Sequence, residues 1–213
     1  MKITKLGHSC LLIQHGECAV LTDPGIYTTE EIKSIKNLDA LFISDTHADH
    51  LNIDSIKILI ANNPELKIYT QTANQKTLAA EGIESALLLE DQQTIVKGMK
   101  VEGIGMKHAV IHSSISQSDN TGYFFGERLF YPGDAFTKPP KKVEILALPV
   151  AGPWLKIADA IEYAIEVAPK ICFPVHDGIL KAPGVVHRAP KEILASHDIS
   201  FVILEPGKET EFA

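Results

Sequence analysis

The chain has 213 residues, a net charge of −7, and hydrophobic and charged contents of 45% and 22%. This length suits one larger domain or two small ones, and the composition is ordinary for a globular protein. Its longest basic stretch, KPPKK at 138–142, is short and contains two prolines, so we expect no nucleic-acid partner. No run reaches the ~18–20 apolar residues that a membrane span needs, so we expect no membrane association either.

The cysteines and the first residues indicate the compartment. Cys10, Cys18 and Cys172 form an odd set without CxxC spacing, which fits a reducing environment better than a disulfide framework. His8 and Gln14 interrupt the first apolar run before it resembles the core of a signal peptide. We therefore expect a soluble, cytoplasmic protein, and whether it forms a homo-oligomer stays open.

The first half of the chain begins with strands and then alternates helices with strands. KITKLG, CLLIQ and CAVLTD predict a short meander that ends at the turn signal DPG at 23–25. A capping box between Thr28 and Glu31 predicts a helix over 28–38. The strand DALFIS follows, then a helix capped by Asn52, and then the strand KIYT, the helix NQKTLAAEG and the strand SALLL.

The second half repeats this plan. Residues 92–134 have the pattern of β-strands only: QTIVKG, MKVEGIGM, GYFFG and RLFYPG. The strand EILALPV, a helix from Ile157 to Ala168, the strand ICFPV, the helix APKEILASHD and the strand FVILE follow. Without a linker between the halves, we predict one domain over 1–213. It would be a four-layer α/β sandwich, with two mixed β-sheets face to face and helices outside both.

Side chains that ligate metals recur directly after predicted strands. The segment SDTHADHLN follows the strand DALFIS and contains Asp45, His47, Asp49 and His50. Later strands are followed by further donors, which are His108, with His112 close behind, then Asp134 in PGD and His176 in VHDG. Loops at strand ends converge on one rim of a sheet, so these residues can meet around an ion. Imidazole and carboxylate together suit Zn²⁺, Mn²⁺ or Fe²⁺.

The spacing favours two ions. Asp45 and His47 can hold one ion from two sides, while Asp49 and His50 face a second ion. Two-metal sites place their ions ~3.5–4 Å apart, and Asp134 is a natural bridge between them. Of the two histidines in the third segment, we expect His108 to be the ligand and His112 to line the cleft.

This combination resembles the metallo-β-lactamase superfamily. The resemblance rests on DTHADH, the later histidine, Gly133–Asp134, PVHDG, and the opening LGHSC and LTDPG, and it covers nearly the whole chain. It implies an αβ/βα fold, a first metal held by Asp45, His47 and His108, and a second held by Asp49, His50 and His176, with Asp134 bridging. The sequence departs from the family at its first ligand, where the family usually has histidine and this chain has Asp45.

Several other residues are candidates for a place near the site. Asp45 could select a harder ion such as Mn²⁺ or Fe²⁺, hold its ion more deeply or through water, or make the first site weak. Asp23 can support a metal-bound histidine or the DPG turn. His8 can face the substrate, support a ligand or have a structural role, and Trp154 can form a pocket wall or pack in the core. We read His15, His187 and His197 as surface residues.

The resemblance implies a metal-dependent hydrolase with two divalent ions, Zn²⁺ first and Mn²⁺ or Fe²⁺ as alternatives. A metal-bound hydroxide, oriented by Asp49 or Asp134, would attack a small ester, lactone or phosphodiester-type substrate. The alternative of another class is a catalytically degenerate protein of the same fold that only binds a metal or ligand. A di-iron oxidoreductase would need an electron-carrying partner, and we rank it last.

Overall fold

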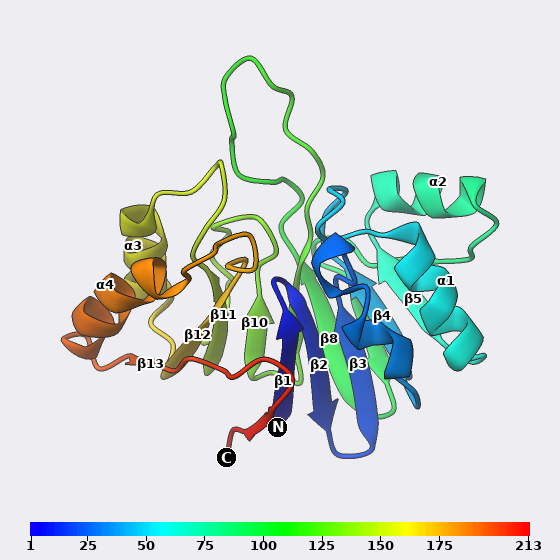
Figure 1. The fold of residues 1–213 in the computed structure, drawn as a ribbon, viewed down its shortest axis with the longest axis horizontal. Coiled ribbons are helices and arrows are strands. Elements are labelled where there is room, and N and C mark those ends of the chain that lie inside the picture. The colour runs from blue at the N-terminus through cyan, green and yellow to red at the C-terminus, as the bar shows by residue number, and fades with distance from the viewer.

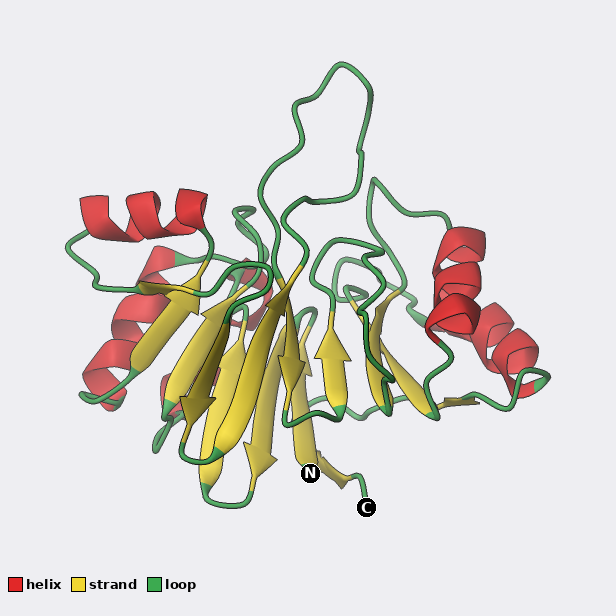
Figure 2. Cartoon of the chain, turned by 180° about the vertical axis from the view of Figure 1, so that it is seen from behind, coloured by secondary structure: helices red, strands yellow, loops and turns green.

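The computed structural model describes residues 1–213 and contains two seven-stranded β-sheets that face each other, with helices outside both (Figures 1 and 2). The first sheet has the order β14 (Glu209–Glu211), β1 (Lys2–Gly7), β2 (Cys10–His15), β3 (Cys18–Thr22), β4 (Ala40–Ile43), β5 (Lys67–Thr70) and β6 (Ala86–Leu87). The second has the order β13 (Ser200–Phe201), β12 (Ile171–Val175), β11 (Ile145–Pro149), β10 (Leu129–Tyr131), β9 (Gly122–Phe125), β8 (Met99–Ile104) and β7 (Gln93–Val96). The predicted four-layer α/β fold is confirmed.

Both sheets combine a meander with a parallel portion. Strands β1, β2 and β3 are antiparallel, and β4, β5 and β6 then add in parallel. In the second sheet β7 to β10 are antiparallel, and β11, β12 and β13 add in parallel. The carboxyl ends of β4, β8, β10 and β12 all lie toward the edge at the top of Figure 1, from which the long loop between β8 and β9 rises.

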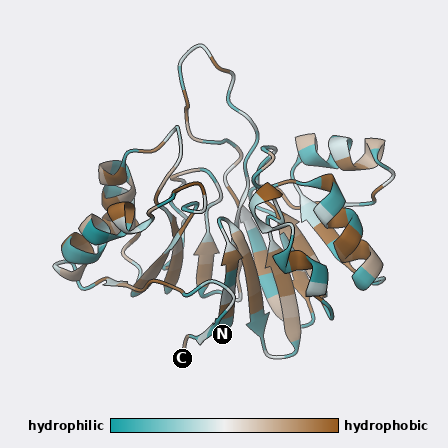
Figure 3. Cartoon of the chain, viewed as in Figure 1, coloured by the Kyte–Doolittle hydropathy of each residue, from teal (hydrophilic) through white to brown (hydrophobic).

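Three apolar clusters hold the layers together. The largest lies between the sheets, where Phe42 of β4 meets Tyr123 and Phe125 of β9 with ring centroids 5.2 Å apart in both pairs. The other two join each sheet to its helices, which are α1 (Ile53–Asn62) and α2 (Thr72–Ala80) on the first sheet and α3 (Ile157–Val167) and α4 (Gly184–Ala195) on the second. In Figure 3 the strands are largely apolar, and the helices outside them carry both apolar and polar residues. None of the helices combines the length and apolar character that a membrane crossing requires.

Two predicted elements differ from the structure. The helix predicted over 28–38 is replaced by two 3₁₀ turns, η1 (Ile26–Thr28) and η2 (Glu31–Ser34). The capping box does not form, because the Thr28 hydroxyl donates to the carbonyl of Gly25, 3.3 Å away. The last predicted strand ends at Phe201, and the chain instead adds the unpredicted β14 to the edge of β1.

A buried ion pair between Lys5 and Asp177 joins the two sheets. The Nζ atom of Lys5 in β1 lies 2.5 Å from Oδ1 of Asp177, which follows β12, and 2.8 Å from the carbonyl oxygen of Pro174. His187 of α4 places Nε2 2.8 Å from the other carboxylate oxygen of Asp177. The prediction that His187 is a surface residue is wrong, because its helix turns this ring inward onto a buried acid.

Candidate metal centre

The loops at the carboxyl ends of four strands bring the predicted metal ligands together. The segment after β4 supplies Asp45, His47, Asp49 and His50, β8 is followed by His108, β10 by Asp134 and β12 by His176. Their ligand atoms form two groups, and within each group they lie within 4.8 Å of one another. One group contains His8, Asp49, His50 and His176, and the other contains Asp45, His47 and His108.

Asp134 lies between these groups. Its Oδ1 is 3.1 Å from Nε2 of His50, and its Oδ2 is 3.0 Å from Nε2 of His176. The same Oδ2 lies 3.3 Å from Nε2 of His108, which belongs to the other group. One carboxylate therefore contacts histidines of both groups, as a bridging ligand would.

Asp45 is part of the smaller group and is fully buried. Its Oδ1 lies 2.5 Å from Nδ1 of His47 and accepts a hydrogen bond from the backbone N–H of His47 at 2.8 Å. Its backbone carbonyl accepts from Nδ2 of Asn74 at 2.9 Å, which anchors the loop on α2. The acid that takes the place of the usual histidine is therefore held against its neighbouring histidine.

Partners outside the ligand groups orient several of the rings. Asp23 places Oδ2 2.7 Å from Nδ1 of His50, and it accepts hydrogen bonds from the hydroxyls of Ser44 and Tyr131. His176 directs Nδ1 at the carbonyl oxygen of Ala151, 2.7 Å away. Such contacts fix ring orientation and leave Nε2 free to face an ion. The roles of Ser44 and Tyr131 were not predicted; the tyrosine lies 108 residues from Asp23 in the sequence.

The remaining candidates differ in position. Trp154 donates its indole N–H to Oδ2 of Asp134 at 3.0 Å, so it contacts the centre directly. His8 is buried beside Asp49, with its Nε2 3.1 Å from Oδ2 of that residue. His112 is exposed in the loop after β8 and directs Nδ1 to the Ser114 hydroxyl at 2.8 Å. The structure therefore brings His108 to the centre and leaves His112 outside it.

Opposite charges dominate the electrostatics of the centre. Burial opposes protonation of His50, but the carboxylates of Asp134 and Asp23 hold its pKa well above the usual value. Burial also opposes protonation of His176, yet the nearby carboxylates of Asp134 and Asp49 raise its pKa to about 9. Despite its burial, the pKa of Asp134 lies well below its usual range because His50, His108 and His176 surround it.

The residues present fit a divalent cation. The buried Oδ2 of Asp45 has no hydrogen-bond partner. The Nε2 atoms of His50 and His176 lie close to the carboxylate of Asp134 but do not have the geometry of a hydrogen bond to it. Leaving buried polar atoms unpaired is costly, so a protein retains them where another partner binds. Imidazole nitrogens and carboxylate oxygens are the donors that Zn²⁺ and related ions take.

Metal affinity is expected to rise with pH. When no metal is bound at neutral pH, His50 and His176 carry protons because their pKa values are raised, and a cation must displace those protons. At pH values below about 9, the pKa of His176, the apparent association constant for the metal rises as the pH rises, because fewer protons must be displaced. The slope is ~10-fold per pH unit for each proton. Calorimetric titration with Zn²⁺ at several pH values measures this slope, and an affinity independent of pH would contradict the assignment of these histidines.

Comparison with known proteins identifies the family. A family model described as the beta-lactamase superfamily domain matches residues 2–176. The chain belongs to this superfamily. Protein Rv0786c of Mycobacterium tuberculosis is 34% identical over 185 residues, which cover 84% of this chain and 85% of that protein. A UPF0173 metal-dependent hydrolase of Methanospirillum hungatei is 28% identical over 223 residues, covering 99% of each chain.

Solved structures show the same fold. A putative metal-dependent hydrolase from Parabacteroides distasonis superposes with a TM-score of 0.76 at 22% identity, covering 95% of this chain and 93% of that one. Igni18, a metallo hydrolase of Ignicoccus hospitalis, gives a TM-score of 0.74 at 16% identity and covers 100% of this chain and 99% of that chain. The predicted superfamily is confirmed, and the protein is a metal-dependent hydrolase of the beta-lactamase superfamily.

Substitution of Asp45 tests its place in this superfamily centre. Asp45→His introduces the residue that the resemblance to the family implies at the first ligand position. We expect the protein to retain its metal and to shift in preference from Mn²⁺ toward Zn²⁺. A nitrogen donor is softer than a carboxylate oxygen and removes one negative charge. Metal content after loading with equal amounts of both ions measures the shift, with Asp54→His at an exposed position of α1 as the control. Loss of all bound metal from Asp45→His would show that position 45 is not a ligand.

Proposed function

We propose that the protein hydrolyses a small, neutral ester or lactone with the help of two divalent cations, Zn²⁺ first and Mn²⁺ or Fe²⁺ as alternatives. Asp45, His47 and His108 would hold one cation, Asp49, His50 and His176 the other, and Asp134 would contact both. Bound there, such ions supply a Lewis acid and lower the pKa of water toward neutrality. The proposal rests on one observation: two groups of metal-ligating side chains meet at Asp134, and exposed apolar side chains lie beside them.

The two carboxylates differ in what they can do. Asp49 reaches solvent with 22% of its side chain exposed, whereas the side chain of Asp134 is 4% exposed. The position of Asp49 suits it to orient an attacking water and to accept its proton. Asp134, held by Trp154 and three histidines, is suited to keep the two groups in register.

Apolar side chains surround the entrance to the centre. Ile26 and Tyr27 are 45% exposed, and the Tyr27 ring lies 4.9 Å from the ring of His8. On the loop after β8, Ile115 is 53% exposed and lines a hollow together with His47 and His108. Exposed apolar groups gathered beside a polar site favour a substrate that has an apolar part.

Charge also favours a neutral substrate. Asp45, Asp49 and Asp134 form ion pairs with histidines only, and no lysine or arginine pairs with them. Sites that bind phosphate commonly use arginine or lysine side chains to neutralise it. An ester or lactone, which carries no net charge, needs no such partner.

A matched substrate series tests this function. The metal-loaded protein is offered p-nitrophenyl esters and lactones of increasing acyl length beside bis(p-nitrophenyl) phosphate. We expect the acyl compounds to be hydrolysed faster, with kcat/KM rising up to ~4-fold for each methylene that becomes buried. Ile115→Ser should reduce this dependence on chain length, while the control Ile95→Ser, which changes an exposed residue of β7, should not.

Two outcomes would contradict the proposal. Faster hydrolysis of the phosphodiester would make the substrate class wrong. No hydrolysis of any compound by protein that binds its metal would favour a catalytically degenerate binding protein.

A further inference from the structure

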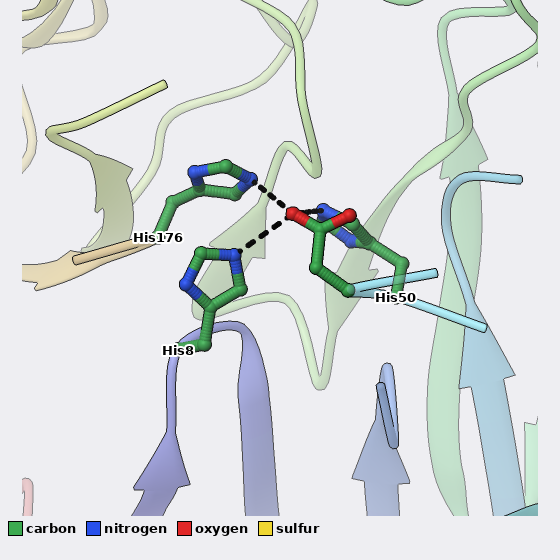
Figure 4. A group of neighbouring side chains, drawn as sticks. His8, His50 and His176 are labelled. Atoms are coloured by element: carbon green, nitrogen blue, oxygen red, sulfur yellow. Dashed lines mark hydrogen bonds and ion pairs between the residues drawn. The ribbon is translucent and has the colours of Figure 1, made fainter. Parts of the chain in front are cut away.

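His8 lies at the centre although it belongs to none of the strand-end segments that supply the other donors. It follows β1 and is separated from Asp49 by 41 residues. Its side chain is 1% exposed, and its Nε2 lies 3.1 Å from Oδ2 of Asp49. Figure 4 shows the rings of His8, His50 and His176 pointing toward a common region.

The spacing of these atoms matches that of metal ligands. Three imidazole Nε2 atoms surround Oδ2 of Asp49, at 3.1 Å for His8, 3.3 Å for His176 and 3.9 Å for His50. Bonds of ~2.0–2.1 Å in a tetrahedral Zn²⁺ site place neighbouring donors ~3.3 Å apart. The contacts of His8 and His176 match this spacing, and all four ligand atoms lie within 4.8 Å of one another, so small movements would let them hold one ion.

The backbone holds His8 in an uncommon conformation that directs its ring toward these ligand atoms. Its φ angle is +40°, in the left-handed region that residues other than glycine rarely adopt. The carbonyl of His8 accepts a hydrogen bond from the N–H of His176 at 3.0 Å. Gly178 permits this approach, because a Cβ atom there would lie 2.9 Å from Cβ of His8. Residues held in such conformations cluster at functional sites, where the surrounding structure stabilises them.

We propose that His8 is a further ligand of the cation held by Asp49, His50 and His176. This inference rests on the proposed metal site and adds a donor to it. The ion beside His8 then has three imidazoles, Asp49 and the shared Asp134, whereas the other ion has two imidazoles, Asp45 and Asp134. The side chain of His47, in the smaller group, is 42% exposed, while those of His8, His50 and His176 are at most 3% exposed. The group that contains His8 therefore binds its ion more tightly and fills first.

Cobalt binding by His8→Asn tests the proposal without a substrate. Asparagine tolerates the left-handed conformation but is too short to reach the ion. Titration of the wild-type protein with Co²⁺ should show a tight ion followed by a weaker one. In His8→Asn we expect the affinity for the tight ion to fall at least ~100-fold, since loss of partners that only orient ligands costs 10–100-fold. The d–d absorption bands of that ion should also change. His197→Asn, at an exposed position, is the matched control.

X-ray absorption spectroscopy of the wild-type protein with one equivalent of Zn²⁺ gives a second test, and it does not depend on whether a variant folds. Three imidazole ligands on the first ion would support the proposal. Two imidazoles, or unchanged cobalt bands in a folded His8→Asn protein, would overturn it and leave His8 as a hydrogen-bond partner of Asp49. Because both tests follow the metal, a protein that binds cobalt through His8 but hydrolyses nothing would refute only the proposed function.

Discussion

Asp134→Asn is expected to lower kcat/KM by ~10³-fold or more, because a metal site contributes several kcal/mol to catalysis and each 1.36 kcal/mol is tenfold. The substitution keeps the size of the side chain and removes its charge. Asp134 contacts His50, His108 and His176, so its carboxylate is the group that the two halves of the centre share. The metal content should fall together with activity. Steady-state kinetics and elemental analysis of the same preparation measure both effects.

The matched control is Asp54→Asn, which neutralises an exposed acid in the first turn of α1. We expect it to leave kcat/KM and metal content at their wild-type values. If Asp134→Asn kept more than about a tenth of wild-type activity with both ions bound, Asp134 would not be the bridging ligand.

Lys5→Ala is expected to lower the free energy of unfolding by about 3–5 kcal/mol, because removing one partner of a buried ion pair leaves the other charge uncompensated. The side chains of Lys5 and Asp177 are 5% and 9% exposed, and burial lowers the pKa of Lys5 despite its acidic partner. Removing the metal keeps bound ions from adding to the stability of either protein. Urea denaturation in the presence of a chelator measures the loss of stability.

Lys2→Ala is the control for this experiment. Lys2 lies on the same strand and pairs with Glu209, but both side chains are 46% exposed. Solvent screens such a pair, so the variant should unfold close to the wild-type urea concentration. Equal destabilisation by the two substitutions would show that the Lys5–Asp177 pair contributes no more than a surface pair.

The sequence predicted the layered fold because the local patterns of its main helices and strands agreed with their final environment. The Asn52 cap of α1 forms, with the Ser55 N–H donating to Asn52 Oδ1 at 2.9 Å, and α3 begins at Ile157 as its apolar spacing predicted. The capping box at Thr28 was misleading, because a serine or threonine hydroxyl can donate to a nearby carbonyl instead of capping a helix. The sequence did not predict β14, because its pairing with the edge strand β1 depends on where the last residues of the chain lie in space.

By itself the sequence determined which donors follow each strand, since residue type and strand ends are local properties of the chain. Asp45, Asp49, Asp134 and the histidines at 47, 50, 108 and 176 could all be named in this way. Only the tertiary structure decided that His8 faces Asp49 and that His187 turns inward onto Asp177. Both contacts depend on how the two sheets and α4 pack together, and such distances between remote segments leave no pattern in the local sequence.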